Sequence, residues 1–179
     1  MASYVALLRG VVPMNPNMRN DKLRSVFSGL GFENVRTVIS SGNVLFDSDE
    51  TDVPRLESKI EAAITQQLGF SSTTIIRSHK ELQALVDRDP FKGIDESKGA
   101  NFNVTFVKTK PGKRLKFPYR PHGKAYTLVA LYGRDICSVI DLKAASTPDL
   151  MTWLEREFGD AITTRTYKTV GRILARLNT

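Results

Sequence analysis

The residues with the clearest chemical potential in this chain are lysines and arginines, and they are concentrated in its second half. The 179 residues carry a net charge of +7, from 26 basic and 19 acidic side chains. Between Glu96 and Asp135 there are nine basic residues and no acidic ones. After Asp160 there are four basic residues and again no acidic ones. A local basic excess is the usual electrostatic footprint of a protein that binds nucleic acid or phosphate.

The last basic residues have a spacing that places them together. Lys168, Arg172 and Arg176 recur every four residues, so on a helix they form one stripe opposite an apolar side. An anionic partner would relieve the repulsion among three like charges. The alternative interpretation is a solvated face that only keeps the protein soluble.

We therefore predict that a nucleic acid or another polyanion binds the second half of the chain. Residues 108–124 contain three prolines and two glycines, so we expect a loop, called the flap below. Tyr119 and Tyr167 are candidates for stacking on bases, although the predicted sheet lacks a recognisable aromatic RNA-binding signature. The predicted nucleic-acid contacts are basic residues of the flap and the stripe with one tyrosine: Lys113, Arg114, Lys116, Arg120, Lys124, Tyr167, Lys168, Arg172 and Arg176.

Motifs for catalysis and metal binding are weak. His79 and His122 have no metal-ligand spacing, and with a single cysteine a zinc site is not expected. No phosphate-binding loop or dinucleotide fingerprint is present. Cys137 lies in an apolar run, where we expect a core residue rather than a nucleophile. We predict no metal and no cofactor, and the residues leave open whether the chain is an enzyme.

The order of predicted elements indicates the fold that must position these residues. The first 77 residues contain a strand, a helix, two strands (35–40 and 44–47) joined by Ser41-Gly42-Asn43, a second helix and a fourth strand. This β-α-β-β-α-β order is the split βαβ arrangement of ferredoxin-like folds. We interpret residues 78–179 as a second, modified unit that includes the flap. The predicted class is α+β: two ferredoxin-like units in tandem, each an antiparallel sheet with helices packed on one face.

Such a fold would also bring several polar side chains together at one edge of the first sheet. The first and third strands are antiparallel neighbours in this arrangement, so Arg9 should lie beside Ser41 and Asn43. An arginine fork with a hydroxyl and an amide can hold a carboxylate or a phosphate, as in an enzyme or a small-molecule binder. Arg165 is the residue of the second half that we expect to complete this site. The alternative is that Arg9 caps the sheet and Gly42 only makes the turn.

Location and assembly are less strongly indicated. The apolar run Tyr4–Leu8 is short, and there is no run of about 18 apolar residues, so we expect a cytoplasmic protein with no membrane partner. An exposed sheet edge would permit pairing with a second copy, so a dimerising scaffold is a third interpretation.

Several short segments carry a resemblance. They are Ala6-Leu7-Leu8-Arg9-Gly10, Gly31-Phe32, Val35-Arg36-Thr37, Ser41-Gly42-Asn43-Val44 with Phe46, Thr163-Thr164-Arg165 and Thr169-Val170. Together they resemble the family called Domain of Unknown Function 1697. The resemblance implies a two-part ferredoxin-like protein, most members of which are bacterial, with no established activity.

Two departures from the family pattern affect any site that its members share. Residues 11–15, Val-Val-Pro-Met-Asn, stand where the family usually has the glycine-rich Ile-Asn-Val-Gly-Gly. Thr166, Tyr167 and Lys168 stand where the family has Asn, Trp and Asn. The resemblance therefore implies that a site using these positions is altered in this chain.

Overall fold

The computed structural model describes residues 1–112 and 114–179. Within these residues the chain forms five α-helices and two four-stranded antiparallel sheets, which confirms the predicted α+β class. The chain divides into two compact units, Met1–Gln83 with Arg172–Thr179, and Ala84–Gly171. Each unit is described by itself below.

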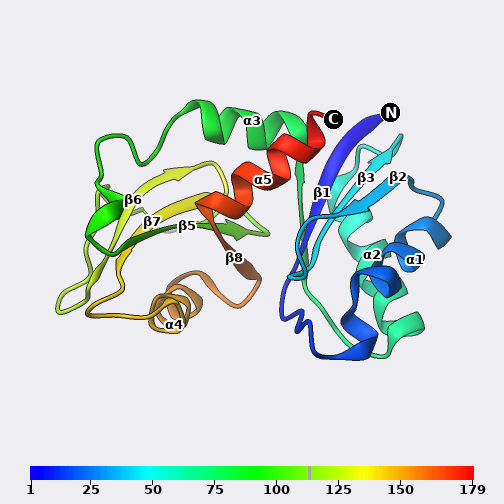
Figure 1. Ribbon diagram of the computed structural model, residues 1–179, viewed down its shortest axis with the longest axis horizontal. Helices are drawn as coiled ribbons and strands as arrows, with labels where there is room; N and C mark the ends of the chain where they lie inside the picture. Colours follow the sequence, from blue (N-terminus) through cyan, green and yellow to red (C-terminus); the bar gives the residue numbers. More distant parts are fainter. Residues whose placement is uncertain (113) are drawn as a thin grey trace. The chain divides into compact units, whose positions relative to one another are not determined.

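The first unit contains the elements β1 (Ala2–Leu8), α1 (Asn20–Gly29), β2 (Glu33–Thr37), β3 (Asn43–Ser48), α2 (Val53–Leu68) and β4 (Thr74–Ser78), with a short 3₁₀ turn at Pro16–Met18. Its strands lie in the order β2-β3-β1-β4. Helices α1 and α2 cover one face of this sheet (Figure 1), where Phe27 and Ile60 pack with Tyr4 and Phe46 in one buried cluster. Burial of these side chains is the main stabilising contribution within the unit.

Local signals account for the ends of α2. Asp52 caps the helix by accepting a hydrogen bond from the N–H of Arg55 at 3.1 Å, and a proline occupies the first turn. Gly69 ends the helix with φ of 74°, a left-handed conformation that glycine adopts without a Cβ clash.

The β2–β3 connection differs from the sequence prediction. The strand predicted over 35–40 ends at Thr37. Asn43 holds Val38 in the turn, donating from Nδ2 to its carbonyl at 3.0 Å, and Asn20 donates to the carbonyl of Ile39 at 2.9 Å. Ile39 consequently has φ of 52°, which a β-branched residue adopts only when its surroundings impose it.

The edge strand β4 is protected by three glutamates. The N–H groups of Thr74, Ile76 and Ser78 donate to Glu61, Glu57 and Glu81 at 2.8, 2.9 and 2.8 Å respectively. Carboxylates therefore occupy the outward donors that would otherwise be free to pair with another strand.

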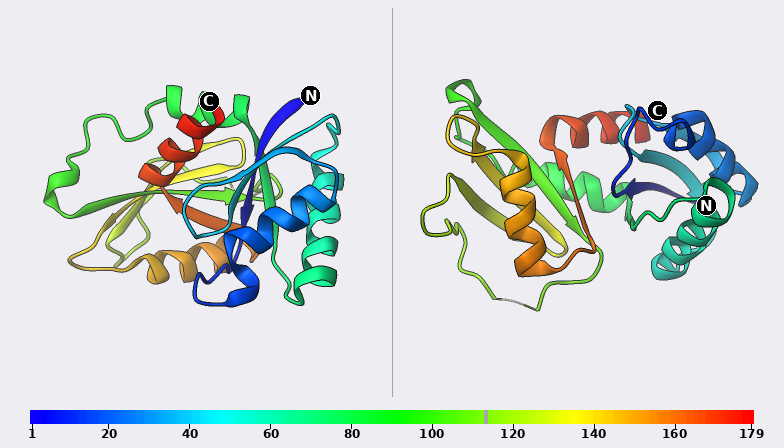
Figure 2. Two further views of the ribbon diagram at one scale, coloured as in Figure 1. Left: turned by 45° about the vertical axis from the view of Figure 1, so that its right-hand side comes forward. Right: turned by 90° about the horizontal axis from the view of Figure 1, so that it is seen from below.

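The second unit contains β5 (Ala100–Val107), β6 (Tyr126–Tyr132), β7 (Asp135–Asp141), α4 (Thr147–Phe158) and β8 (Ile162–Thr166), with a 3₁₀ turn at Glu96–Lys98. The strand order is β6-β7-β5-β8. Figure 2 shows α4 lying across one face of this sheet, and its Leu150 and Trp153 pack there with Tyr126 and Ile136. The flap occupies the connection between β5 and β6.

Two further helices fall at the division between the units. Helix α3 (His79–Asp87) follows β4 directly, and α5 (Tyr167–Leu177) follows β8 directly. The predicted amphipathic pattern of α5 is confirmed, because Val170, Ile173 and Leu174 are buried. The predicted boundary between residues 77 and 78 falls within β4, before its last residue, whereas the compact units divide after Gln83.

Candidate nucleic-acid interface

The base of the flap is anchored to the second sheet. Tyr119 and Leu128 form a bridge in which each N–H donates to the other's carbonyl at 2.8 Å. The Tyr119 ring is half-buried and lies 6.0 Å from the Trp153 ring, between centroids. Tyr119, predicted as a stacking residue, thus contributes to the packing of the unit.

The tip of the flap is a tight turn with basic side chains. The N–H of Lys124 donates to the carbonyl of Pro121 at 3.1 Å, and Arg120 Nε donates to the carbonyl of Lys124 at 2.9 Å. Pro121 is buried, which fixes the turn against the unit. Arg120, His122 and Lys124 line a hollow of about 530 Å³ at this tip. Its chemistry suits a phosphate or another anion.

The described basic residues of the predicted interface form no ion pairs, although Lys124 lies close enough to Asp149 for its charge to add to the Ser146 hydrogen bonds in lowering the pKa of that carboxyl. Seven of them form no ion pair within residues 1–112 and 114–179: Arg114, Lys116, Arg120, Lys124, Lys168, Arg172 and Arg176. Lys113, the remaining predicted base, lies outside the described residues. By contrast, Arg55 pairs with Glu50 in the first unit at 3.4 Å. All seven side chains are exposed, so their charge is available to a ligand.

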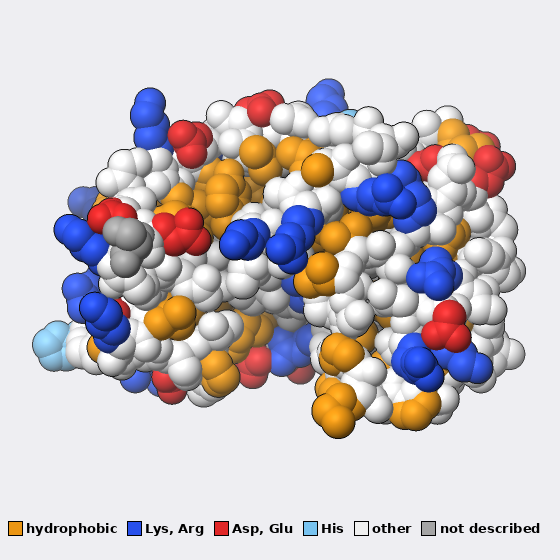
Figure 3. Space-filling view, in the orientation of Figure 1, with side chains coloured by type: hydrophobic (Ala, Val, Ile, Leu, Met, Phe, Trp, Pro, Cys, Tyr) orange, Lys and Arg blue, Asp and Glu red, His pale blue; other side chains and the backbone are white. Residues whose placement is uncertain are grey.

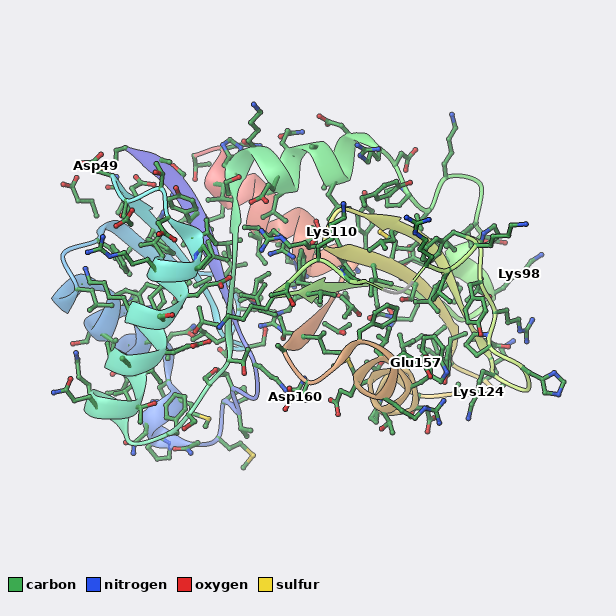
Figure 4. The ribbon with its side chains drawn as sticks, turned by 180° about the vertical axis from the view of Figure 1, so that it is seen from behind. Asp49, Lys98, Lys110, Lys124, Glu157 and Asp160 are labelled. Atoms are coloured by element: carbon green, nitrogen blue, oxygen red, sulfur yellow. The ribbon has the colours of Figure 1, made fainter. Side chains whose placement is uncertain are left out.

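The figures show where basic side chains gather. In Figure 3 blue side chains stand along the left margin of the second unit, mixed with fewer red ones. Figure 4 labels Lys98 and Lys124 at the same margin of this unit, seen from behind. Both residues are exposed.

The predicted stripe lies on α5. Lys168, Arg172 and Arg176 are all exposed and all within this one helix. The main chain near its end is held by Arg36, whose Nη1 donates to the carbonyl of Arg176 at 3.0 Å. The stripe is therefore a surface feature of a well-packed helix.

A second hollow, of about 380 Å³, lies where β8 meets α5. Its lining residues come from four elements, the 3₁₀ turn, β5, β8 and α5: Glu96, Asn101, Phe102, Thr166, Tyr167 and Lys168. Of these, the sequence predicted Tyr167 and Lys168. It missed the other four: Asn101 and Phe102, which alternation identifies only as strand residues, and Glu96 and Thr166, which have no distinguishing pattern.

An aromatic cluster backs this second hollow. Phe91 is buried and stacks on Phe102 with ring centroids 4.6 Å apart and an interplanar angle of 2°. The Tyr167 ring meets Phe91 edge-on at 4.9 Å. Burial raises the pKa of the Tyr167 phenol, and the negative charge of Asp89 adds to this effect. Tyr167 therefore remains a neutral aromatic ring at physiological pH.

The structure places Arg9 and residues 41–43 at the same end of the first sheet. The N–H of Leu8 donates to the carbonyl of Gly42 at 2.8 Å, and the N–H of Arg9 donates to the carbonyl of Thr73 at 2.9 Å. Asn43 is fully buried, and its Nδ2 donates to the carbonyl of Val38 and to Ser41 Oγ, both at 3.0 Å. The amide thus closes its own turn, and ligand binding at this edge stays a prediction.

Arg165 lies in β8 of the second unit and is nearly buried. Its Nη1 donates to Thr163 Oγ1 at 2.7 Å and to the carbonyl of Thr164 at 3.0 Å. Burial lowers the pKa of its guanidinium to about 10, so it stays charged at neutral pH. Whether Arg165 completes a site with Arg9 concerns two separate units and stays a prediction.

Comparison with known proteins identifies the family. The profile described as "Protein of unknown function (DUF1697)" matches residues 1–136. The chain belongs to this family. The resembling tail segment, residues 163–170, lies beyond the matched residues. No curated protein matches the chain.

A solved structure shares the fold of this DUF1697 protein. It is that of a conserved bacterial protein, SP0830, from Streptococcus pneumoniae, with 20% sequence identity and a TM-score of 0.70. The match covers 100% of this chain and 99% of that one. Within the described residues, no helix is long and apolar enough to cross a bilayer.

Proposed function

We propose that this protein binds single-stranded nucleic acid through the exposed basic residues of its second unit and of α5. The observation that carries the proposal is the flap tip, where Arg120, His122 and Lys124 surround one hollow and form no ion pair among the described residues. The aromatic hollow at Tyr167 adds a surface suited to bases.

Electrostatics explains why a polyanion is favoured over a single small anion. The exposed basic side chains of the second unit include Lys116, Arg120 and Lys124 in the flap and Lys168 at the start of α5, so a ligand with charges at repeated intervals can contact several of them. Each contact with a phosphate releases condensed counterions, which makes binding favourable and strongly dependent on salt. The aromatic hollow beside Lys168 favours unpaired strands, whose bases are free to stack.

A charge-reversal experiment with a matched control tests the proposal. R120E/K124E should weaken binding of a fluorescent single-stranded RNA at least tenfold in an anisotropy titration at low salt. The control, K22E/K80E, makes the same charge change at exposed lysines of α1 and α3 and should have a much smaller effect. Equal effects of the two variants would reject the flap as the binding surface.

The two other interpretations stay predictions with less support. A ligand at the Arg9 edge would have to compete with internal hydrogen bonds, because Asn43 Nδ2 donates to the Val38 carbonyl and to Ser41 Oγ. A dimer formed by strand addition would have to use an edge other than β4, whose outward N–H groups are occupied.

We further infer that both units are variants of the ferredoxin-like plan. The two sheets have equivalent strand orders, with β5, β6, β7 and β8 in the positions of β1, β2, β3 and β4. Arg77 opposite Val5 in the first sheet corresponds to Arg165 opposite Val104 in the second, and each arginine donates from Nη1 to the carbonyl of its preceding residue. The flap takes the place of the first helix in the second unit. We also infer a bacterial, cytoplasmic setting, which supplies the proposed ligand and keeps the Cys137 thiol reduced.

A further inference from the structure

We propose that the hollow where β8 meets α5 is a pocket for one unstacked guanine nucleotide. The inference rests on the proposed function and specifies which base of a single strand is recognised. Three observations support it. Two aromatic rings are held in place, three polar groups form no hydrogen bond or ion pair within the described residues, and the volume of the hollow matches that of one nucleotide.

The aromatic rings are held by buried packing. Phe102 and Tyr167 are half-buried and line the hollow, whereas Phe91 is 5% exposed and contacts both rings from behind. The two lining rings are therefore fixed before a ligand arrives. A base that stacks on a preorganised ring loses little conformational freedom of the protein.

The polar groups around the hollow have no partners within the part of the chain that the structure describes. The Glu96 carboxylate, the Asn101 carboxamide and the Lys168 ammonium form no hydrogen bond or ion pair there. Thr166 is different, because its Oγ1 accepts from the N–H of Thr169 at 3.2 Å and so caps the helix. Three uncommitted groups of different chemistry suit one ligand with a phosphate and a hydrogen-bonding base.

The chemistry of these groups favours guanine over the other bases. A carboxylate has two acceptor oxygens and no donor. Guanine presents two adjacent donors, N1–H and the 2-amino group, on its Watson–Crick edge, whereas adenine, cytosine and uracil each present a single donor group there. Glu96 can thus accept two hydrogen bonds from guanine, Asn101 can donate to its O6, and Lys168 can contact the phosphate. That edge is free only in an unpaired strand.

The size of the hollow agrees with this ligand. Its volume is about 380 Å³, within the range of small-ligand pockets and enough for one nucleotide but not for stacked bases. The pocket is confined to the second unit, so it needs nothing from elsewhere in the chain.

The test uses the full chain and four nucleoside 5′-monophosphates in an NMR titration of backbone amides. Guanosine monophosphate should shift the amides of residues 96, 101, 102, 167 and 168, and should bind at least about fivefold more tightly than the other three. E96Q should remove that preference, because an amide offers only one acceptor oxygen. Equal binding of all four nucleotides, or shifts elsewhere on the protein, would overturn the inference.

A second pair of variants separates stacking from folding. Y167F keeps the ring and should bind guanosine monophosphate as the unmodified protein does, whereas Y167L should lose at least about fivefold in affinity. The far-UV circular dichroism of both variants shows whether they are folded. If E96Q keeps the guanine preference in a folded protein, the pocket assignment is wrong even when Y167L fails to fold.

The inference and the proposed function can fail separately. Salt-sensitive RNA binding that depends on the flap but shows no base preference would reject the pocket and leave the function. Selective binding of guanosine monophosphate without binding of RNA would reject the function and leave the pocket.

Discussion

Gly42 is the position where the backbone of the first unit leaves least room for a side chain. Its φ is 77°, and a Cβ atom there would lie 2.8 Å from Val11 Cγ2 and 3.0 Å from Leu8 Cβ. Gly10 provides a matched control, because its φ is 76° and nothing lies within 4 Å of a Cβ at that position. G42A and G10A therefore share the backbone strain, and only G42A adds crowding.

The expected loss of stability follows from these two effects. A left-handed conformation costs a non-glycine residue about 1–2 kcal/mol. Crowding against packed neighbours costs about 1–3 kcal/mol more, so G42A should lower the free energy of unfolding by about 2–5 kcal/mol and G10A by about 1–2 kcal/mol. With a urea slope of about 2 kcal/mol/M, the midpoint for G42A should fall by about 1–2.5 M.

The measurement is urea unfolding followed by far-UV circular dichroism. Tryptophan fluorescence is a useful second probe because Trp153, the single tryptophan, reports on the second unit. In G42A the urea midpoint followed by circular dichroism should fall, because the first unit is destabilised. The midpoint followed by Trp153 fluorescence, which reports on the second unit, should fall less. If G42A and G10A had equal midpoints, the close approach of Val11 and Leu8 to the turn would be refuted.

Two further predictions concern titratable groups. Burial raises the pKa of the Cys137 thiol to about 12, so this one thiol should not react with Ellman's reagent at pH 8 in the folded protein and should react fully in urea; rapid reaction of the folded protein would contradict its burial. Hydrogen bonds from the Ser146 side chain and N–H, at 2.6 and 2.8 Å, lower the pKa of the Asp149 carboxyl below 3.8. Because the pKa of Asp149 is lower in the folded than in the unfolded protein, its carboxylate stabilises the fold above about pH 4, and this stabilisation is lost as the pH falls through the folded pKa. S146A should therefore raise the Asp149 pKa in a ¹³C NMR titration. An unchanged pKa would refute the cap.

Local patterns in the sequence predict much of this fold. The apolar run of β1 and the four-residue spacing in α2 lead to their observed elements, because one buried face imposes a period on each. The terminal helix was predicted in the same way from its basic stripe and apolar side. These features depend on neighbours in the sequence.

The parts that were missed depend on contacts between distant residues. Ile39 leaves the predicted strand because Asn20, 19 residues earlier, holds its carbonyl. The aromatic cluster behind the second hollow joins Phe91, Phe102 and Tyr167, which come from a loop, a strand and a helix. Neither contact has a signature in the spacing of residue types, so the hollow could not be anticipated although two of its residues were.

The most direct test of the proposed function is the salt dependence of binding to single-stranded RNA. If Lys116, Arg120, Lys124 and Lys168 of the second unit each contact one phosphate, the slope of log affinity against log salt should be about −2.8, and affinity should fall about 50-fold between about 50 and 200 mM salt. The measurement is fluorescence anisotropy, with single-stranded and duplex DNA as comparisons. Salt-sensitive binding that prefers the single strand is the predicted result. No binding at low salt, or an affinity that does not change with salt, would contradict it.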